Sequence, residues 1–567
     1  MKKFKRLFID NISSDFNINE DITLGPWCLL NQFDLNKIKK LQKRKIFIID
    51  DKTDQIDAFK TCELQHSRIL EEFAIYIKSI NLDKHSLEFY KNYTSNWLSS
   101  FIHIIHYSER LINIYIEKYK KENINIILFY KPKKIIFKNS SDFINKCIID
   151  YNFFSNFVLF LLLKKKPESW KITYCNNDEK KNNNRISKFN FNLFTDRLKG
   201  KIFKILSPRV NEVYGLNIFE RVLLSLILLL KKPIKKNMEI QNYYSKINAN
   251  IIESPLDDNR LISLAKELIP ISFKEIHKKN EKYFNCRGKI MLCSASSILV
   301  DDDKRLSSML FKENGGKIVS IQHGGHYGEL YVIRGSMEFG FDKFISWGQK
   351  RHPSYELDFK PLPSPQLKLN YKKNKSDKIL FASTVNFFHY PRYIACQSFG
   401  DTVNRIDDTT TFLSELSPQL IKKINYNLHL GQFTEEKILK KKFSDLKFIN
   451  SSLEKNLNKS QLVIQNHYST FFLKCLAANA PTICFFKRNN WKLNDRALKF
   501  YDNLHKAEIL FYDPKKAAEK VSNNWDDLDG WWNQKSIQSA RIDFCNEFAL
   551  KDNKWLKKWI NYFFNEF

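Results

Sequence analysis

The chain has 567 residues, 43% of them hydrophobic, which indicates a large globular protein of two or three domains. Lys and Arg number 93 against 62 Asp and Glu, a net charge of +31 that would attract phosphates, nucleic acid, anionic lipids or acidic sugars. The chain is also rich in Lys, Asn, Ile and Phe and has only 15 glycines, a bias that an AT-rich coding sequence would produce by itself. Charge alone therefore selects no partner.

The ten cysteines are scattered, with no C-x-x-C pair and no zinc-site spacing, which argues against a zinc ribbon or a disulfide scaffold. The basic start of the chain lacks the apolar stretch of about 7 to 15 residues and the small-residue cleavage site of a secretory signal. We therefore expect reduced, mostly buried thiols in a cytoplasmic protein, with peripheral contact at the inner face of the plasma membrane as an alternative.

A dense amphipathic pattern without Gly or Pro runs from 61 to 118 and predicts a helical block. Short β-rich runs such as 126–130 follow, and the Asn- and Lys-rich stretch 176–187 is typical of a surface loop. Two apolar runs, 157–163 and 222–230, end in lysines and are far shorter than the roughly 20 residues that span a bilayer. We interpret both runs as buried elements, with a shallow insertion among lipid phosphates as the alternative.

An alternation of strands and helices begins near 289. The predicted elements are strand 290–294, helix 307–313, strand 317–321 and strand 343–348. This order is typical of a parallel α/β sheet. The proline-rich stretch 351–365 that follows is typical of an interdomain linker.

The alternation starts again beyond the linker. The predicted elements are strand 378–382, helix 411–424, strand 426–430, strand 462–464, helix 471–478, strand 482–486 and a Trp-rich helical segment, 517–567, over the domain seam. Two successive α/β units imply a cleft between two Rossmann-like domains. We therefore predict an α/β protein with an acceptor-side domain at 1–350 that contains the helical insertion, a linker at 351–376, and a nucleotide-binding domain at 377–567 with terminal helices.

The sharpest motif, Gln-His-Gly-Gly-His-Tyr-Gly-Glu at 322–329, directly follows a predicted strand, where parallel sheets place ligand-binding loops. Its glycines let the backbone approach a ligand closely. His323 is the candidate base for an acceptor hydroxyl, because the ordinary pKa of histidine suits proton transfer near neutral pH. Glu329, Glu338 or Asp342 would orient the ring or the acceptor. A glycine turn with surface histidines is the alternative interpretation.

A second motif, Gln-Asn-His-Tyr-Ser-Thr at 465–470, leads from a predicted strand into a helix. Ser469 and Thr470 would lie at the helix N-terminus, where unpaired N–H groups and the helix dipole favour a phosphate, although a plain N-cap would look the same. His429 and Arg392 are weaker candidates for contacts with a phosphate or base. The residues expected to bind the donor or its phosphates are Gly324, Gly325, His326, Gly328, His429, Ser469 and Thr470.

Metal chemistry is not expected. The histidines of the second half, among them His323, His326, His352 and His389, form no helical i, i+4 pair with a carboxylate partner. Transfer of a group from an activated donor needs no redox cofactor. The small molecule that we expect is therefore a nucleotide-sugar co-substrate.

At these residues the sequence resembles a family of transferases encoded among bacterial O-antigen and surface-carbohydrate genes. The shared features are Leu24-Gly25-Pro26-Trp27, the stretch 97–110, the loop 322–328, Trp347-Gly348, Ser469-Thr470, Trp491 and Trp531-Trp532. The resemblance implies a GT-B glycosyltransferase, with two Rossmann-type domains facing a cleft. Such an enzyme would move a sugar from a nucleotide donor to an O-antigen, lipopolysaccharide, capsule or lipid-linked glycan acceptor, and helix dipoles would stabilise the leaving phosphate without a metal.

Two better-understood groups are similar at the same places. Teichoic-acid glycerophosphotransferases have a Gln-x-x-His-Gly loop whose histidine acts as the base and matches His323, with Ser320 here in place of the glutamine. Capsule Kdo transferases and bacterial sialyltransferases hold a CMP phosphate with a hydroxyl pair that matches Ser469 and Thr470. Their His-Pro pair corresponds here to His429 followed by leucine. The resemblance thus implies a cytidine-nucleotide donor.

Two other functions stay open. The first is transfer of a polyol phosphate from a CDP-linked donor, with attack at phosphorus instead of an anomeric carbon. The second is a non-enzymatic RNA- or membrane-binding protein, for which the +31 charge and the 14% aromatic content speak. No RNP-like, zinc-knuckle or helix-turn-helix signature supports nucleic-acid binding, so no specific nucleic-acid partner is expected.

Overall fold

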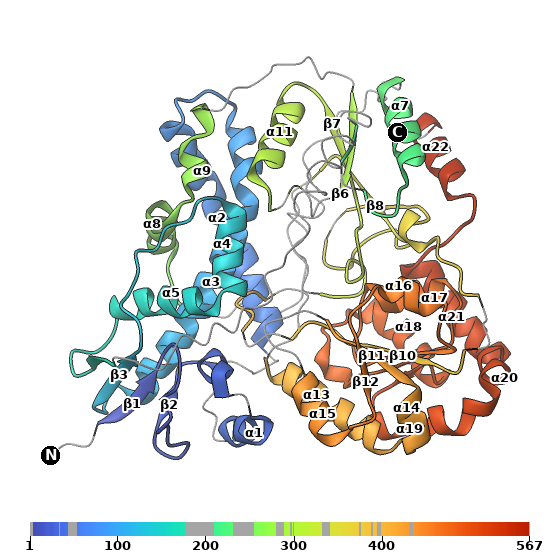
Figure 1. Ribbon diagram of the computed structural model, residues 1–567. Coiled ribbons are helices and arrows are strands. Elements are labelled where there is room, and N and C mark those ends of the chain that lie inside the picture. Colours follow the sequence, from blue (N-terminus) through green and yellow to red (C-terminus); the bar gives the residue numbers. More distant parts are fainter. Residues whose placement is uncertain are drawn as a thin grey trace.

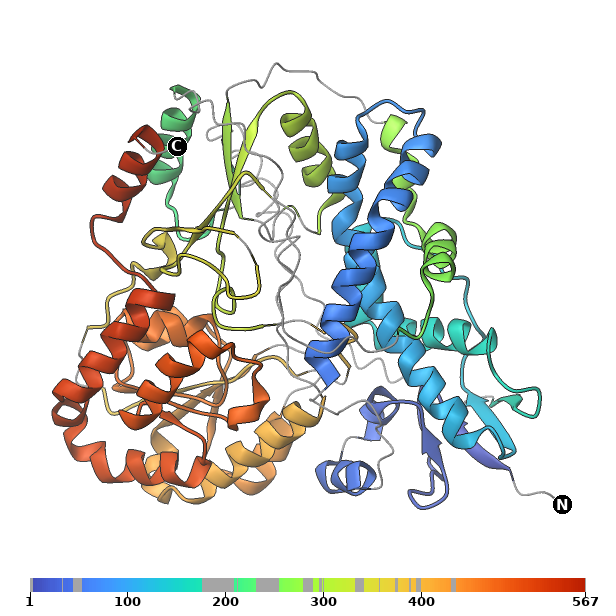
Figure 2. The same cartoon turned by 180° about the vertical axis from the view of Figure 1, so that it is seen from behind.

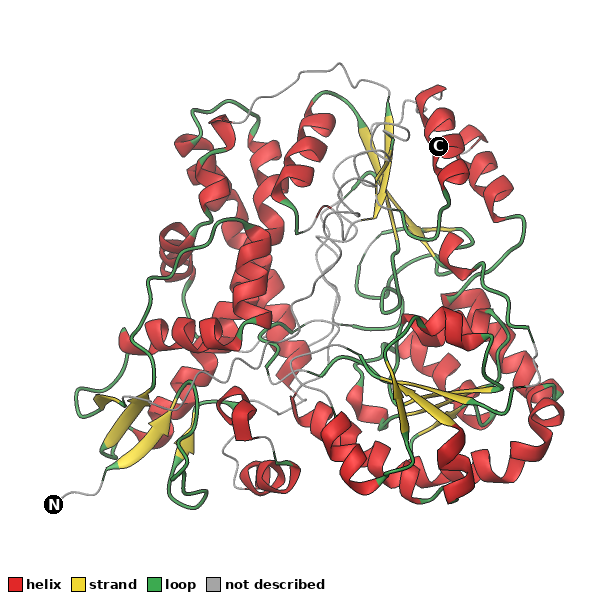
Figure 3. Cartoon of the chain, viewed as in Figure 1, coloured by secondary structure: helices red, strands yellow, loops and turns green. Residues whose placement is uncertain are grey.

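Three sheets, each built of parallel strands only, form the framework of the protein (Figures 1 and 3). The computed structural model describes residues 4–32, 34–43, 54–175, 209–211, 213–230, 254–278, 289–294, 298, 300–331, 341–355, 357–372, 376–386, 389–393, 399–429 and 435–565. Parallel sheets covered by helices confirm the predicted α/β class. The GT-B arrangement, the domain boundaries and the linker stay predictions.

The first sheet has the order β2-β1-β3-β4 and packs with long helices. Its elements are β1 (Lys5–Phe8), β2 (Ile22–Thr23), α1 (Leu35–Lys43), α2 (Asp54–Ile80), α3 (Leu87–Tyr119), β3 (Ile124–Leu128), α4 (Ser140–Ile144), η2 (Asn145–Ile149), α5 (Tyr151–Leu163) and β4 (Lys171–Tyr174). The predicted helical block 61–118 corresponds to α2, which begins earlier, at Asp54, and to α3; the two helices run side by side (Figure 2). Left-handed backbone at Leu82 and Asp83 (φ 61° and 51°) separates them, and the Ser86 hydroxyl accepts from Phe89 N to begin α3.

The second sheet, β5-β6-β7-β8-β9, lies between two layers of helices. Its strands are β5 (Val210–Asn211), β6 (Ile290–Ser294), β7 (Lys317–Ile321), β8 (Lys343–Ser346) and β9 (Lys360–Pro361), and α7 (Ile218–Leu230) and α11 (Asp302–Glu313) pack on it. The helices α8 (Asp258–Leu268) and α9 (Ile271–Lys274) precede β6 in the chain but pack against α2. Alternate residues of β6 and β7 point to opposite faces: Ile318 joins the core of α11 and the N-terminal helices, and Val319 joins a core with α7.

The third sheet has the order β12-β11-β10-β13-β14-β15, which in chain order is 3-2-1-4-5-6, the order of dinucleotide-binding folds. Its strands are β10 (Ile379–Ala382), β11 (Ile424–Asn427), β12 (Lys447–Ile449), β13 (Leu462–Gln465), β14 (Thr482–Phe485) and β15 (Leu510–Phe511). Its helices are α13 (Phe399–Ser414), α14 (Pro418–Lys423), α15 (Glu436–Lys442), α16 (Leu453–Leu457), α17 (Thr470–Ala477), α18 (Asp495–Lys506), α19 (Pro514–Asn524), α20 (Leu528–Trp532) and α21 (Lys535–Phe548).

The last helix, α22 (Trp555–Asn565), leaves the third sheet and returns to the second (Figure 1). Trp555, Trp559 and Phe563 are buried there against strand residues and against α7. The Trp559 indole N–H donates to Pro363 O at 2.9 Å, within the stretch predicted as a linker. The C-terminal segment therefore ties the two sheets together.

Three predictions on individual elements need correction. The helix predicted at 411–424 is two helices, α13 and α14, because Pro418 favours a new helix start and cannot continue the first helix. The strand predicted at 426–430 begins earlier, at Ile424, in register with Ile379 of β10. The apolar run 222–230 is buried on one side only, because the opposite side of α7 is exposed.

The other apolar run, 157–163, belongs to α5 and is mostly buried, as predicted. No single helix in the described ranges is long and apolar enough to cross a membrane. One helix pair, Ser140–Ile149 and Tyr151–Leu163, meets the length and composition criteria only when its two parts, bent by 93°, are taken together.

Candidate functional site

The third sheet has a topological switch point between β10 and β13, where the strand order reverses direction. In open parallel sheets, ligands bind outside the carboxyl ends of the strands at such a point. The polar segment 466–469, which leads from β13 into α17, lies at this edge. The switch point therefore coincides with the second sequence motif.

The glycine-histidine loop of the second sheet contacts that same segment. Gly325 N donates to Thr470 Oγ1 at 3.0 Å, and His326 N donates to the Tyr468 hydroxyl at 3.1 Å. A methyl group at Gly324 would lie 2.7 Å from Thr470 Oγ1, so only glycine permits this approach. The two motifs, about 145 residues apart in the sequence, meet in one site.

Gln322, which the sequence analysis did not include among the site residues, fixes the path of the loop. Its side-chain amide donates to Gly324 O at 2.7 Å, and its oxygen accepts from Trp347 N at 2.8 Å and from Gln349 Nε2 at 3.1 Å. Gln322 is buried, as are Trp347 and Gln349. Buried hydrogen bonds of this kind hold a loop in one conformation.

His323, the candidate base, is half-buried in this loop. Its Nδ1 is hydrogen-bonded to the hydroxyl of Tyr327, whose ring is buried and stacked on Phe344. Its backbone carbonyl accepts from Gln366 Nε2 at 3.0 Å. The Tyr327 hydroxyl can donate to Nδ1 or accept from it, and in either case the bond holds the ring in place; in the tautomer with the proton on Nδ1, Nε2 is the atom that accepts a proton.

His326 lies beside the switch point. It adopts a left-handed conformation (φ 83°), stacks on Trp491 at 5.3 Å between ring centroids, and meets Tyr468 edge-on at 4.8 Å. Burial, with a smaller contribution from His323, lowers the pKa of His326 to about 4. The ring is therefore neutral at physiological pH.

Glu329 lies in the seam between the loop and the third sheet. Its carboxylate contacts the Tyr468 hydroxyl and accepts from Gly328 N at 3.0 Å, while its backbone carbonyl accepts from Asn494 N at 2.8 Å. Burial raises the pKa of Glu329 to about 7. The structure thus joins Glu329 to Tyr468, and none of its described contacts is with the His323 ring.

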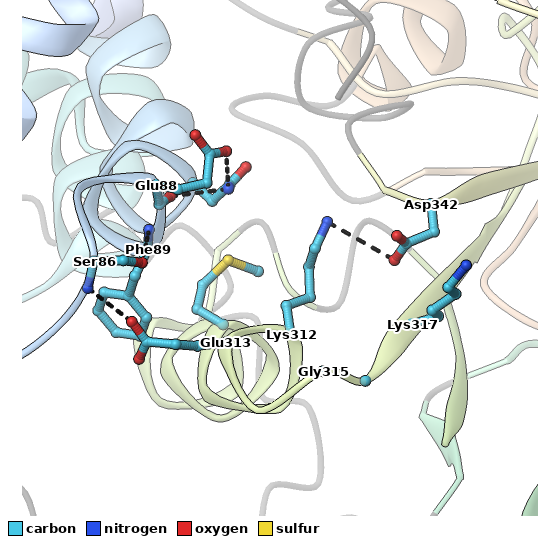
Figure 4. A pocket seen from close by; sticks show the side chains of 11 residues that line it. Ser86, Glu88, Phe89, Lys312, Glu313, Gly315, Lys317 and Asp342 are labelled. Carbon is cyan, nitrogen blue, oxygen red and sulfur yellow. Dashed lines mark hydrogen bonds and ion pairs between the residues drawn. The ribbon is translucent and has the colours of Figure 1, made fainter. Parts of the chain in front are cut away.

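Asp342 lies at the opposite edge of the second sheet. Its carboxylate accepts from Ile318 N at 2.7 Å, at the start of β7, whereas His323 follows the end of that strand, about 16 Å away at the rise of a β-strand. Asp342 lines a pocket of about 300 Å³ and faces Lys312, 3.8 Å away (Figure 4). The structure therefore does not bring Asp342 to His323, and Glu338 lies outside the described residues.

Ser469 and Thr470 begin α17, as predicted, but their hydroxyls have protein partners. Ser469 Oγ donates to Gln465 Oε1 at 3.2 Å and makes no capping bond to the helix, and Thr470 Oγ1 accepts from Gly325. His429 is exposed past the end of β11, close enough for its charge to act on His467. Arg392 contacts the Tyr390 hydroxyl at 2.7 Å, and no described contact joins it to the loop.

Arg405 is a buried cation at the carboxyl edge of the third sheet and belongs to no recognisable sequence motif. It lies on α13 and contacts Asn386 Oδ1 with one terminal nitrogen, while its Nε and Nη1 are buried without a hydrogen-bond partner among the described residues. Burial, then Arg405, His429 and His326, hold the pKa of His467 well below its usual value. A buried guanidinium with two open N–H groups beside a neutral histidine favours an anion.

Chemically, the site combines a positioned histidine, a helix N-terminus and a buried cation. Such groups can accept a proton from a hydroxyl and stabilise a leaving phosphate. Among the ranges that the structure covers, no group of three or more His, Cys, Asp or Glu side chains could hold a metal ion. Metal-free chemistry stays a prediction.

Comparison with known proteins gives one family. No curated protein matches the chain. The family model described as LIC12162 family transferase matches residues 5–563, nearly the whole chain, and the protein therefore belongs to this family of transferases.

Proposed function

We propose that this transferase is a cytoplasmic glycosyltransferase of the GT-B type, which moves a sugar from a nucleotide donor to a surface-polysaccharide acceptor. The observation that carries the proposal is the contact between the glycine-histidine loop and the switch point, where Gly325 N meets Thr470 Oγ1 at 3.0 Å. A base on one sheet and an anion site on another meet there, as transfer between two bound substrates requires.

In the proposed reaction the acceptor hydroxyl attacks the anomeric carbon of the donor sugar. The new C–O bond forms as the bond from that carbon to the donor phosphate breaks, and the nucleotide leaves with the electron pair. His323 takes the hydroxyl proton at Nε2, while its Nδ1 stays hydrogen-bonded to the Tyr327 hydroxyl, which orients the ring. Arg405 and the first turn of α17 stabilise the negative charge on the leaving phosphate.

The nucleotide is expected at the carboxyl edge of β10 and β13. Asn386 follows β10, and its amide nitrogen contacts Glu435, which also accepts from the Tyr426 hydroxyl at 2.9 Å. Asn466 follows β13 and donates to Thr409 Oγ1 at 2.8 Å. These bonds hold the polar groups beside Arg405 in place before a donor arrives, which lowers the cost of ordering on binding.

A thermal-shift screen against CMP, CDP, UMP, UDP, GDP and TDP tests the proposal, because a ligand that binds only the folded state raises its stability. At a hundredfold excess over Kd the gain is about 2.7 kcal/mol. We expect one base to be preferred, and Arg405→Met to abolish its shift while Arg260→Met, at an exposed arginine of α8 among the N-terminal helices, leaves it unchanged. Lack of a shift with any nucleotide would contradict the proposal.

Donor turnover separates sugar transfer from polyol-phosphate transfer. With a donor labelled at the phosphorus next to the transferred group, glycosyl transfer leaves the label on the released nucleotide. Attack at phosphorus, in contrast, moves the label into the product. Label in the product would replace the glycosyltransferase proposal with the phosphotransferase alternative.

A further inference from the structure

Helix α7 has two apolar faces, one buried in the protein and the other exposed to solvent. Leu224, Ile227 and Leu228 are buried against the second sheet. On the other side, Phe219 is 70% exposed and Leu230 is 79% exposed. The exposed apolar residues of the helix, which fall on one side at 100° per residue, are Ile218, Phe219, Leu226, Leu229 and Leu230.

This concentration of exposed apolar side chains is local. Seventeen large hydrophobic side chains are exposed in the described part of the chain, and five of them lie on this one helix of 13 residues. Single exposed hydrophobic residues are ordinary on a protein surface, whereas a contiguous group marks an interaction site. The outer side of α7 is therefore a candidate docking surface.

The neighbouring helix α22 gives this surface a charge. Both helices pack on the same face of the second sheet and lie side by side (Figures 1 and 2). Lys557 is exposed on the outer side of α22, and Lys554 is exposed directly before the helix begins. Glu220, the carboxylate of α7, contacts Lys368. Asp552, just before α22, pairs with Lys558 at 2.6 Å and is also close enough to Lys554 for their charges to interact, whereas no described carboxylate pairs with Lys557.

Exposed apolar side chains on α7 beside exposed lysines at α22 fit the surface of an anionic membrane best. Apolar side chains enter the boundary between headgroups and acyl chains, while lysines meet anionic headgroups. A second copy of this chain would instead bring like-charged lysines together. We propose that the outer faces of α7 and α22 bind an anionic lipid membrane, so that the transferase works at the membrane surface.

Vesicle co-sedimentation of the full chain tests this inference, with phosphatidylcholine vesicles containing or lacking phosphatidylglycerol. We expect binding only to the anionic vesicles and a roughly tenfold or larger loss in Phe219→Glu with Leu226→Glu. The matched control is Leu82→Glu with Ile542→Glu, two exposed apolar residues on other helices or turns, which should bind as the parent does. Equal binding by the α7 variant, or no binding by the parent, would overturn the proposal.

Substitution of the lysines tests the electrostatic part of the proposal separately and leaves the apolar face of α7 intact. Neutralising Lys554 and Lys557 with glutamine should weaken binding about fivefold for each lysine and flatten its salt dependence. Lys499→Gln with Lys506→Gln, two exposed lysines of α18, is the control. The alternative occupant is a second copy of the chain, and light scattering in the same buffer tests for it. A parent protein that is a dimer, becomes monomeric with the α7 substitutions and binds no vesicles would show self-association at this surface and overturn the membrane proposal.

Discussion

The buried carboxyl group of Glu329 is expected to make the stability of the folded protein depend on pH, and Glu329→Gln should remove this dependence. Glu329 is 1% exposed, and burial raises its pKa to about 7, with the bonds from Tyr468 and Gly328 offsetting part of the rise. Because the folded pKa lies above the unfolded one, the folded state binds the proton more tightly. The resulting stabilisation is fully present below the unfolded pKa and is lost as the pH rises through about 7.

The size of the effect follows from the two pKa values. A folded pKa of about 7 against an ordinary value of 4.5 corresponds to about 3 kcal/mol, at roughly 1.4 kcal/mol for each pH unit. This free energy is an upper bound, since surrounding groups relax when the carboxyl group ionises. Glu329→Gln keeps the shape of the side chain and one acceptor oxygen for Gly328 N, and its amide can donate to the Tyr468 oxygen. Because glutamine does not titrate, the stability of the variant lacks this pH-dependent contribution.

Thermal unfolding of the parent and of Glu329→Gln between pH 5 and pH 8.5 measures the effect. All other titrating groups are common to both proteins, so they cancel in the difference between midpoints. We expect the parent to lose several °C relative to the variant as the pH rises, whereas Glu519→Gln, at an exposed glutamate, should follow the parent at every pH. A difference that stays constant, or that grows toward low pH, would refute the argument.

Three further predictions concern the loop, and a fourth concerns Asp342. His323→Ala should lower kcat by roughly 10²- to 10⁴-fold without loss of nucleotide binding, and full activity would remove His323 as the base. Tyr327→Phe should lower kcat with little change in KM and shift the pH–rate profile, because the His323 ring loses its partner. Gly324→Ala should lower the unfolding midpoint through its 2.7 Å approach to Thr470 Oγ1, and Thr470→Ala should relieve part of that loss. Asp342→Asn should keep near-parental kcat, because it lies at the far edge of the sheet; a hundredfold loss would place it in the reaction.

The loops that carry the site could be predicted because each follows an apolar strand. In a chain with 15 glycines, three of them at 324–328 indicate a backbone that must approach something closely. The structure shows what it approaches: Thr470 of the other motif. Their meeting was not predictable from spacing, since it depends on how two separate sheets are placed.

Other parts of the site carry no local signal. Arg405 lies in a polar stretch in which only Val403 and Ile406 join the buried core, so the start of α13 and the burial of its arginine were both missed. The burial of Arg405 follows from tertiary packing, which no local pattern shows. The separation of Asp342 from His323, in contrast, follows from the predicted elements: Asp342 precedes one strand of the parallel sheet and His323 follows another, so the two residues lie at opposite ends of the strands.

The contacts at the switch point also rank the groups that would hold a donor phosphate. Ser469 Oγ donates to Gln465 Oε1, so a phosphate that accepts from this hydroxyl must replace a bond worth about 1 kcal/mol. Thr470 Oγ1 accepts from Gly325 N, a bond that a phosphate accepting from the same hydroxyl does not have to replace. Arg405 has two N–H groups without such partners among the described residues, and a guanidinium bond to phosphate is about twice as strong as a neutral one. Arg405→Met should therefore weaken nucleotide binding more than Ser469→Ala with Thr470→Ala, and the reverse order would mean that the phosphate lies at the helix N-terminus, away from the guanidinium.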